Sequence, residues 1–582
     1  MTRTDTFVVG TLVVVLAIVA GLIGVPALQN ASNAAGRSAT PGPSAPPIEA
    51  RPYVEGALGA PGSVSPLTAH TQVDRDLSAL VFSGLVRNGP AGTIVPDLAE
   101  RWSVDAAGKT WTVDIREDAL WHDGEPVTAE DVAFTIRTLQ DADFAGPAAR
   151  SWSEVTVTVV DDRRVTFTLA TPLGGFLQAL TQPLAPAHLL ADVPVDALAD
   201  DPFGSQPVGS GPFALVEMSA TGASLVPAAV VESEVGEPGA APSAGSTDSL
   251  TTPAPTTRPS RPMPYLTGIE FRFYADSEVL AADFRSGSLD AASGLPPRMA
   301  LDLAAIESTR VVRYPTSTLT AALLNVRPTH PEFALPAVRS GFLAAIDRQA
   351  LIEAAYAGAA AAAPGPIPPS SPLFDPAAAP TVAYDRAAAG KAFRAAGWTR
   401  DDAGWHLPKV KEPLSIEVLS PMESSNRDLF AAAQSVVRDW TKMGLQVKHV
   451  PLPPGEFVTD RLATGTFQVA IADLRIGLDP DLYPLLASSQ TLTGGSNVMG
   501  VQDPTLDALL TKARAPGSDA ARTAAYRALQ VQLAAGRYLL PLAFPDEVVV
   551  FHDTVQGPVA RQVNDPSDRF WDVLTWRLAV DP

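Results

Sequence analysis

The chain has 582 residues, which is enough for several domains or for one large two-lobed protein. Its 63 acidic and 42 basic residues give a formal net charge of −21. A surface this anionic repels phosphate backbones, which argues against nucleic-acid binding. Because the chain has no cysteine, disulfides, a thiol nucleophile, cysteine-ligated zinc and a thioether lipid anchor are all excluded.

The first feature along the chain is an apolar run at residues 7–28 that contains no charged side chain. As a helix it would span about 33 Å, against a membrane hydrocarbon core of about 30 Å. Arg3 precedes the run, which favours export of everything after it. The alternative is a cleaved signal peptide, whose apolar core is usually only about 7–15 residues. We therefore expect residues 1–28 to be a transmembrane anchor or signal segment, and the rest to be extracytoplasmic or secreted.

Two segments have the composition of flexible chain. Residues 29–50 contain no aromatic residue and are rich in Ala, Ser and Pro, which predicts a disordered stalk. Residues 227–264 repeat this composition, but the flanking residues 213–226 and 266–273 both have the pattern of strands. We therefore expect a disordered insertion within one lobe, replacing a short hairpin loop, rather than a linker between domains.

Between these segments the sequence mixes strand and helix patterns. Alternating apolar residues at 111–115 predict a strand, and the pattern at 155–169, with a turn at Asp161 and Asp162, predicts a hairpin. Apolar residues at 429–443 recur at helical spacing, and Gly444 ends that pattern before a further strand pattern. The mixture predicts a large α/β or α+β protein.

The search for a catalytic centre gives mostly negative results. The sequence contains no HExxH, GxSxG or GxGxxG motif, and its seven histidines lack the local spacing of a metal site. Residues 106–110 resemble the end of a phosphate loop, but Ser103 replaces the required glycine and a strand follows. Asp479 and Asp481 flank Pro480 within apolar sequence, where helix capping is an alternative to ligand binding. These residues indicate a binding protein without catalytic residues, metal or cofactor.

A recognisable series of motifs begins at residue 75. It comprises RDL at 75–77, LVFSGL at 80–85, PDLAERW at 96–102 and, most specifically, WHDGEPVTAEDVAF at 121–134. PVGSGPF at 207–213, FRSGSLD at 284–290, AIDR at 345–348, AAGW at 395–398 and NVMGVQDPTLDALL at 497–510 follow in order. Over roughly residues 60–560 the sequence resembles the family 5 extracellular solute-binding proteins of ABC transporters, the oligopeptide-, dipeptide- and nickel-binding group.

The resemblance implies an α/β fold of the periplasmic-binding-protein type, cluster C and type II-like, with two lobes and an extra small domain. Lobe 1 would comprise residues 51–85, 206–312 and 547–582, including the insertion at 227–264. The small domain would cover 86–205 and lobe 2 would cover 313–546. The chain would cross between the lobes near Val312 and Glu547.

The implied function is a receptor that binds a peptide or similar oligomer in the cleft between the lobes and delivers it to the permease of an ABC importer. The N-terminal helix would hold it at the membrane. The alternative is a cell-envelope sensor or regulator of the same fold, which binds a glycolipid or glycopeptide without transport. The missing lipid-anchoring cysteine and an altered ligand loop favour this alternative.

In peptide-binding members of the family, an aspartate in the loop before a DP pair holds the peptide amino group. Counting back from Asp479-Pro480 places this position near Ile476, which is not an acid. Asp473 could substitute only if the loop carried about three extra residues, and Arg475 would instead favour an anionic group or remain solvated. The candidate ligand contacts, for each of which packing or capping is an alternative, are Ser65, Arg475, Asp479, Asn497 and Phe544.

Overall fold

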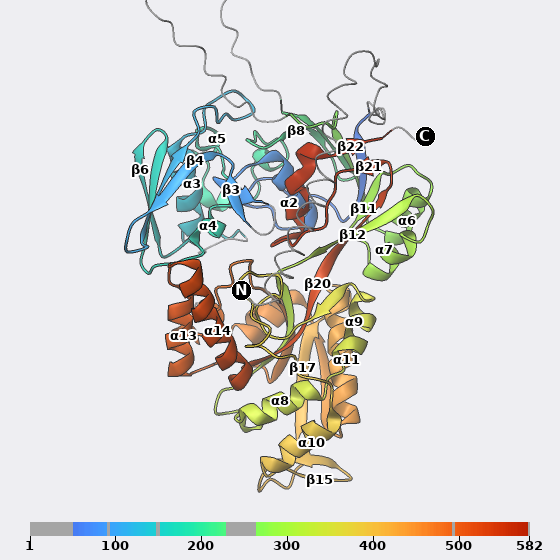
Figure 1. The fold of residues 1–582 in the computed structure, drawn as a ribbon. Coiled ribbons are helices and arrows are strands. Elements are labelled where there is room, and N and C mark those ends of the chain that lie inside the picture. The colour runs from blue at the N-terminus through green and yellow to red at the C-terminus, as the bar shows by residue number, and fades with distance from the viewer. Residues whose placement is uncertain (1–50, 90–92, 147–151, 229–262, 492–494, 580–582) are drawn as a thin grey trace, which may run out of the picture. The chain divides into compact units, whose positions relative to one another are not determined.

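The computed structural model describes residues 51–89, 93–146, 152–228, 263–491 and 495–579, and Ala50–Asp581 form one compact unit (Figure 1). Strands and helices alternate through this unit, which confirms the predicted α/β class. The predicted anchor and stalk, and most of the predicted insertion, lie outside the described residues. Within the part that is described, no helix is both long and apolar enough to cross a membrane.

A twelve-stranded sheet runs through the unit. Its path, in spatial order, is β18 (Gln446–Leu452), β17 (Ser415–Pro421), β19 (Val469–Arg475), β13 (Thr318–Leu324), β20 (Leu539–His552), β11 (Ala291–Ser293), β1 (Tyr53–Leu58), β10 (Ile269–Tyr274), β9 (Gly222–Pro227) and β8 (Phe213–Met218). Two more strands pair with β20, namely β12 (Thr309–Pro315) and β14 (Ala360–Ala362).

The long strand β20 is shared by two halves of this sheet. Its first part pairs antiparallel with β13 and its second part pairs antiparallel with β12. We call β13, β14 and β17–β19 the β13 half, and β1 and β8–β12 the β1 half. The chain passes between the halves at residues 316–317 and between Pro545 and Asp546. The lobe and domain boundaries inferred from the family resemblance remain a prediction.

Helices cover both faces of the β13 half. The apolar spacing at 429–443 produces α11, whose Leu429, Val436 and Trp440 are buried against the sheet, so this helix prediction is confirmed. One face carries α8 (Pro336–Ala344), α9 (Arg348–Tyr356), α10 (Arg386–Ala395) and α11 (Arg427–Lys442). The other carries α12 (Tyr483–Leu486), α13 (Pro504–Arg514) and α14 (Asp519–Gly536).

The β1 half is covered by α6 (Ser277–Arg285) and α7 (Pro297–Leu303) on one face. Its other face packs on α2 (Gln72–Val81), on the 3₁₀ helix η7 (Pro566–Thr575) and on a core that continues into a smaller sheet. That sheet has the order β4 (Ala99–Val104), β5 (Thr110–Ile115), β7 (Arg164–Leu169), β6 (Val155–Asp161), and α3 (Ala129–Gln140) lies over it. Strand β5 and the hairpin β6–β7 confirm two local predictions.

The strand pattern predicted at residues 213–226 is divided by a turn. Residues 213–226 form two strands, β8 and β9, because the Ser219 hydroxyl accepts hydrogen bonds from the N–H groups of Thr221 and Gly222 and thereby makes a turn. Strand β9 then pairs antiparallel with β10, with Leu225 opposite Ile269. Strands β9 and β10 are therefore antiparallel neighbours, and the insertion between them remains a prediction.

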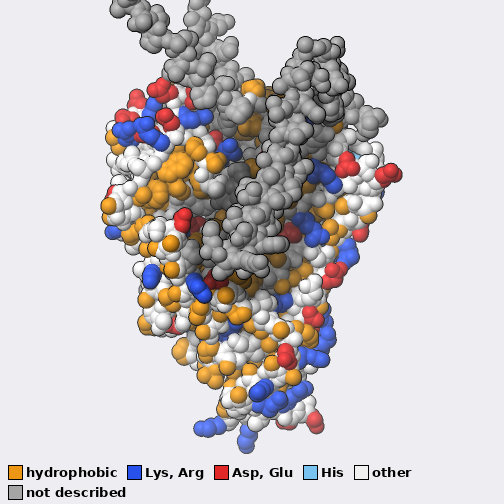
Figure 2. Space-filling view, in the orientation of Figure 1, with side chains coloured by type: hydrophobic (Ala, Val, Ile, Leu, Met, Phe, Trp, Pro, Cys, Tyr) orange, Lys and Arg blue, Asp and Glu red, His pale blue; other side chains and the backbone are white. Residues whose placement is uncertain are grey.

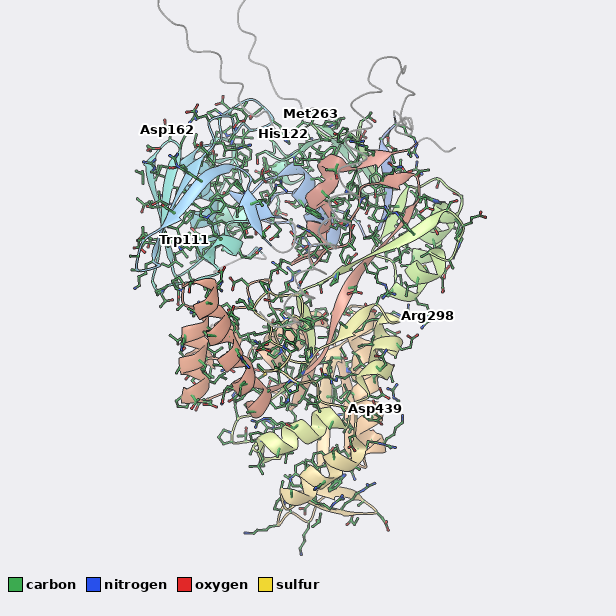
Figure 3. The ribbon with its side chains drawn as sticks, viewed as in Figure 1. Trp111, His122, Asp162, Met263, Arg298 and Asp439 are labelled. Atoms are coloured by element: carbon green, nitrogen blue, oxygen red, sulfur yellow. The ribbon has the colours of Figure 1, made fainter. Side chains whose placement is uncertain are left out.

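The strongest sequence signature serves to hold segments together. His122 Nε2 donates to the Gly211 carbonyl at 3.1 Å, and Nδ1 accepts from Gly209 N–H at 3.2 Å (the His122 side chain is labelled in Figure 3). A Cβ atom on Gly209 would lie 2.0 Å from the Val81 carbonyl oxygen. The WHDG turn, the PVGSGPF segment and the end of α2 therefore fit together only with glycine at this position.

Smaller elements complete the unit. The two-stranded pairs are β2 (Val86–Asn88) with β3 (Ile94–Pro96), β15 (Thr399–Asp401) with β16 (Gly404–His406), and β21 (Val555–Gln556) with β22 (Arg577–Leu578). The short helices are α4 (Phe176–Ala179), α5 (Ala187–Leu190), η2 (Val195–Ala197), η3 (Pro202–Gly204), η4 (Pro331–Phe333), η5 (Glu456–Leu462) and η6 (Ser488–Thr491). Despite the net negative charge, Lys and Arg side chains gather over α10 and β15, where Lys391, Arg394, Arg400 and Lys409 are exposed (Figure 2).

Candidate ligand-binding site

The first crossing between the two sheet halves is tied to the loop that precedes η7. Ser317 N–H donates to the Val563 carbonyl at 3.1 Å, and Val563 N–H donates to the Pro315 carbonyl at 3.0 Å. The Ser317 hydroxyl donates to Asn564 Oδ1 at 2.8 Å. These bonds hold Asp565, the N-cap of η7, next to the start of β13 and the end of β19, which lie opposite each other in the sheet.

Arg475 and Asp565 form an ion pair at this junction. Arg475 is the last residue of β19, and its Nη1 lies 3.2 Å from Asp565 Oδ2. The same carboxylate oxygen lies 3.2 Å from Nε of Arg75 in α2. Although burial raises the pKa of Asp565, the two guanidinium groups hold it below its usual range. Arg475 thus has an internal anionic partner, while 64% of its side chain remains exposed.

Asp473, two residues earlier on β19, belongs to a chain of hydroxyl groups. The Thr320 hydroxyl donates to Asp473 Oδ1 at 2.6 Å and lies 2.8 Å from the Tyr356 hydroxyl. Since a threonine hydroxyl has one proton, Tyr356 is the donor to Thr320. The Asp473 side chain is solvent-exposed, yet burial raises its pKa. This carboxylate therefore touches water at a place that protein atoms surround on most sides.

A second carboxylate lies close to Asp473. Asp428 is in the first turn of α11, where Asn426 is the N-cap, and its side chain is half-buried. Burial and the charge of Asp473 raise the pKa of Asp428 to about 6, which Arg427 only partly counteracts. No residue in the described ranges donates a hydrogen bond to the Asp428 side chain or forms an ion pair with it. The two carboxylates are therefore an under-neutralised pair that would be stabilised by a cation.

Glu547 is a third carboxylate near the crossing, on β20 directly opposite Tyr314 of β12. Burial raises its pKa to about 7, with Asp76, Asp565 and Glu55 adding to the effect and Arg569 opposing it. Within the described part of the chain, its side chain has no hydrogen-bond donor or ion-pair partner. Glu547 therefore contributes a further negative group at the junction, on the β1 half.

Beneath Glu547, a buried ion-pair network fixes the β1 side of the junction. The Arg569 guanidinium is 1% exposed and lies 2.8 Å from Glu55 Oε1 and 2.6 Å from Asp76 Oδ2. The Tyr53 hydroxyl donates to Glu55 Oε2 at 2.8 Å. Strand β1, helix α2 and η7 are thus joined by side chains that satisfy one another, which makes this network structural rather than ligand-binding.

Three of the predicted contacts occupy buried structural positions. Ser65 makes a turn in which its carbonyl accepts from Thr68 and Ala69 N–H at 3.1 and 2.9 Å. Asn497 is 1% exposed and its Nδ2 donates to three carbonyls of the surrounding loops. Phe544 is 4% exposed in a core of the β13 half. Their contact with a ligand remains a prediction.

Asp479, the fourth predicted contact, is neutralised by a neighbouring residue. Both of its carboxylate oxygens accept from Arg522 Nη2 of α14, at 2.6 and 2.8 Å. It also lies against Gly175, on which a Cβ atom would be only 2.8 Å from Asp479 Cγ. Asp479 therefore joins α14 to the loop before α4, whereas Arg475 stays at the sheet junction.

The position that the family pattern assigns to the amine-binding aspartate is buried. Ile476 is 7% exposed, its side chain belongs to a core of the β13 half, and its N–H donates to the Ser317 carbonyl at 3.3 Å. The sequence indicates Asp473 only as a conditional substitute and gives no indication of Asp428. An acid in the first turn after an N-cap has an ordinary explanation in the helix dipole, so no local signal could have identified Asp428.

Comparison with known families defines this chain as an extracytoplasmic solute-binding protein. The model of the bacterial extracellular solute-binding proteins, family 5, middle region, matches residues 93–497. The chain belongs to this family, as its sequence motifs indicated.

Relatives that cover most of the chain include peptide-binding proteins. Protein XP55 of Streptomyces lividans is 29% identical over 513 residues, which cover 87% of this chain and 86% of that protein. Di/tripeptide-binding protein 1 of Pseudomonas aeruginosa is 24% identical over 535 residues, covering 87% and 90% respectively. The oligopeptide-binding protein AppA of Bacillus subtilis, solved with a nonapeptide, aligns at a TM-score of 0.69 and 20% identity, covering 92% of this chain and 100% of that one. This last likeness shows the two-lobed fold alone.

Proposed function

We propose that this protein is an extracytoplasmic receptor that captures peptides, or polar oligomers of similar size, between the two sheet halves and delivers them to an ABC importer. The names of relatives, which include peptide-binding proteins of ABC transporters and a di/tripeptide-binding protein, support this ligand class. The apolar run at residues 7–28 would tether the receptor to the membrane. The importer's ATPase subunits, and no chemistry of this chain, would supply the energy for transport.

The observation that carries the proposal is the pair of carboxylates formed by Asp428 and Asp473. The charge of Asp473 raises the pKa of Asp428, and both carboxylates raise the pKa of Tyr356, so a cation placed between them would relieve an electrostatic cost. A peptide carries such a cation as its terminal ammonium group or as a basic side chain. Thr320 and Tyr356 hold Asp473 in a fixed orientation, so little ordering is needed when the cation binds.

Closure of the two halves would complete the site. Arg475 reaches from the β13 half to Asp565 beside the β1 half, and Arg298 in α7 forms a second such ion pair with Glu353 in α9 at 2.5 Å (Arg298 is labelled in Figure 3). A ligand favours the closed arrangement only by as much as it binds that arrangement more tightly. An anionic group of the ligand would compete with Asp565 for the exposed part of Arg475.

The test is a binding titration of the full-length protein with tetrapeptides of matched sequence that carry either a free or an acetylated N-terminus. We expect Asp473→Asn to weaken binding of the free-amine peptides at least about tenfold, the effect of about 1.4 kcal/mol, and to leave the acetylated peptides nearly unchanged. Asp402→Asn, at an exposed turn acid of the same half, is the matched control. Equal loss for both peptide sets, or no loss for either, contradicts the assignment of these carboxylates.

The alternative, a sensor or regulator without transport, is favoured by two observations. The chain has no cysteine for lipid anchoring, and Ile476 stands buried at the position of the usual amine-binding acid. Native mass spectrometry of the full-length protein distinguishes the two functions. Co-purifying peptides support the receptor for import, whereas a bound glycolipid, together with no binding across peptide libraries, supports the regulator.

A further inference from the structure

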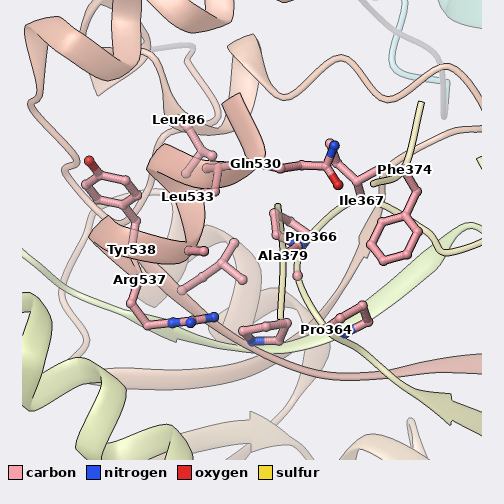
Figure 4. Close-up of a pocket in the computed structure, with 14 residues that line it drawn as sticks. Pro364, Pro366, Ile367, Phe374, Ala379, Leu486, Gln530, Leu533, Arg537 and Tyr538 are labelled. Carbon is pink, nitrogen blue, oxygen red and sulfur yellow. The ribbon is translucent and has the colours of Figure 1, made fainter. Parts of the chain in front are cut away.

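A small cavity lies inside the β13 half, away from the sheet junction. Its volume is about 20 Å³, and apolar side chains make up most of its wall (Figure 4). They come from the segment after β14, from α12 and α14, and from the start of β20. The lining includes Pro364, Ile367, Phe374, Leu486, Leu533 and Arg537.

Arg537 is the charged residue of this wall. It follows α14 with φ = 48° and its N–H donates to the Leu533 carbonyl, which fixes the direction in which its side chain leaves the helix. The residue is 7% exposed, and Figure 4 shows the guanidinium pointing in among the lining side chains. Its Nε is buried without a hydrogen-bond partner.

Two neighbouring arginines add to the positive charge. Arg348 donates to the Ala363 and Val382 carbonyls, and Arg339 donates to the carbonyls of Gly536 and of Arg537 itself. Burial lowers the pKa of Arg348 to about 10, and the charge of Arg537 adds to this effect. The described ranges contain no carboxylate that forms an ion pair with any of these three arginines. Arg339 already donates to the carbonyls at the end of α14.

A buried charge without a counter-charge is strongly unfavourable, and buried cations in proteins are normally paired. A water molecule could accept hydrogen bonds from Arg537 but could not neutralise it. A cavity needs about 10–15 Å³ to hold one water-sized species, so this one admits a single small species and excludes sulfate, phosphate or a peptide carboxylate. The size of the cavity and the charge of Arg537 in its wall therefore match a monatomic anion.

We propose that this cavity binds one small monovalent anion of the halide class, held by the Arg537 guanidinium. The site is separate from the ligand site at the sheet junction and does not depend on the proposed transport function. The anion would stabilise the packing of α14 and β20 against the segment that follows β14. Binding of the anion would make the stability of the β13 half increase with halide concentration.

The direct test is anomalous diffraction from crystals of the full-length protein grown in bromide. We expect an anomalous peak in the cavity at hydrogen-bonding distance from Arg537 Nε or Nη. A cavity that holds only water, or nothing, in bromide at concentrations near those of physiological chloride overturns the proposal. This outcome does not depend on whether any variant folds.

A solution measurement gives an independent readout. At constant ionic strength, with gluconate replacing chloride, we expect the melting temperature of the wild-type protein to rise with the logarithm of chloride concentration. Arg537→Met should abolish that rise, and Arg386→Met, at an exposed arginine of the same half, should retain it. An equal response to chloride in all three proteins would contradict an anion site at Arg537. If Arg537→Met does not fold, Arg537→Lys, which keeps a cation with fewer donors, should show a weakened response.

Discussion

Arg475 and Asp565 join two parts of the chain that are 90 residues apart in sequence, at a distance of 3.2 Å between Nη1 and Oδ2. The first ends a strand of the β13 half and the second begins η7, which packs on the β1 half. Because Asp565 also contacts Arg75, one carboxylate connects both halves of the sheet.

Replacing Arg475 with Gln should loosen that connection. The side chain is 64% exposed, so the pair contributes at most about 1 kcal/mol to the free energy of unfolding. The unfolding midpoint should therefore change little, while small-angle scattering of the unliganded protein should show a larger radius of gyration. Arg137→Gln, which removes an exposed pair within α3, is the control. Identical scattering from both variants would mean that the Arg475 pair does not hold the halves together.

Ligand binding should weaken as the pH falls through about 6. The pKa of Asp428 is raised to about 6 in the unliganded protein, so this carboxylate becomes neutral below that pH and attracts a ligand cation less. Between pH 7 and pH 5 the dissociation constant of a free-amine tetrapeptide should rise about tenfold, as measured by calorimetry. Asp428→Asn should remove this dependence over the same window. Affinity that is constant or increases towards pH 5 in the wild type would contradict the assigned role.

Replacing Glu547 with Gln should stabilise the protein above neutral pH. Burial raises the pKa of Glu547 to about 7, above its ordinary value, so the folded state binds more protons than the unfolded state between those two values. Its contribution to stability is therefore lost as the pH rises towards 7, by at most about 3 kcal/mol. Urea unfolding at pH 8 should show a gain for Glu547→Gln, and at pH 4 the gain should vanish. A gain of equal size at both pH values would point to packing instead of charge.

Removing Arg569 should be severely destabilising. Its guanidinium is 1% exposed and neutralises both Glu55 and Asp76, so Arg569→Met would leave two buried carboxylates uncompensated. We expect a loss of about 3–5 kcal/mol in the free energy of unfolding, measured with urea. The variant Arg137→Met, at an exposed site, should lose less than about 0.5 kcal/mol. A loss below 1 kcal/mol for Arg569→Met would be inconsistent with a structural role for this network.

Gly175→Ala should disturb the contact between α14 and the loop before α4. The new Cβ atom would lie 2.8 Å from Asp479 Cγ, so either the loop moves or the Asp479–Arg522 pair breaks. A destabilisation of about 1–3 kcal/mol is expected by thermal unfolding. Gly455→Ala is the matched control, because its φ is −61° and no atom lies within 4 Å of its added Cβ. Equal stability of the two variants would rule out this close approach in solution.

The sequence by itself determined the family and many local elements. The WHDGEPVTAEDVAF motif identified the family, and the spacing of apolar residues predicted α11, β5 and the β6–β7 hairpin. These features depend on residues within one or two turns of each other, where periodicity and turn chemistry act. The strand pattern at 213–226 forms two strands, because the Ser219 turn divides it.

Only the tertiary structure decided which polar groups meet at the crossing between the sheet halves. Asp428 and Asp473 come from a helix start and a strand, and Asp565 reaches Arg475 because Val563 pairs with the crossing at Ser317. The tertiary structure also decided that no carboxylate of the described residues forms an ion pair with Arg537, since its neighbours come from other elements. Charge interactions act between residues that are close in space but distant in sequence. The local sequence pattern around a residue therefore cannot predict which distant segment the strand register places beside it.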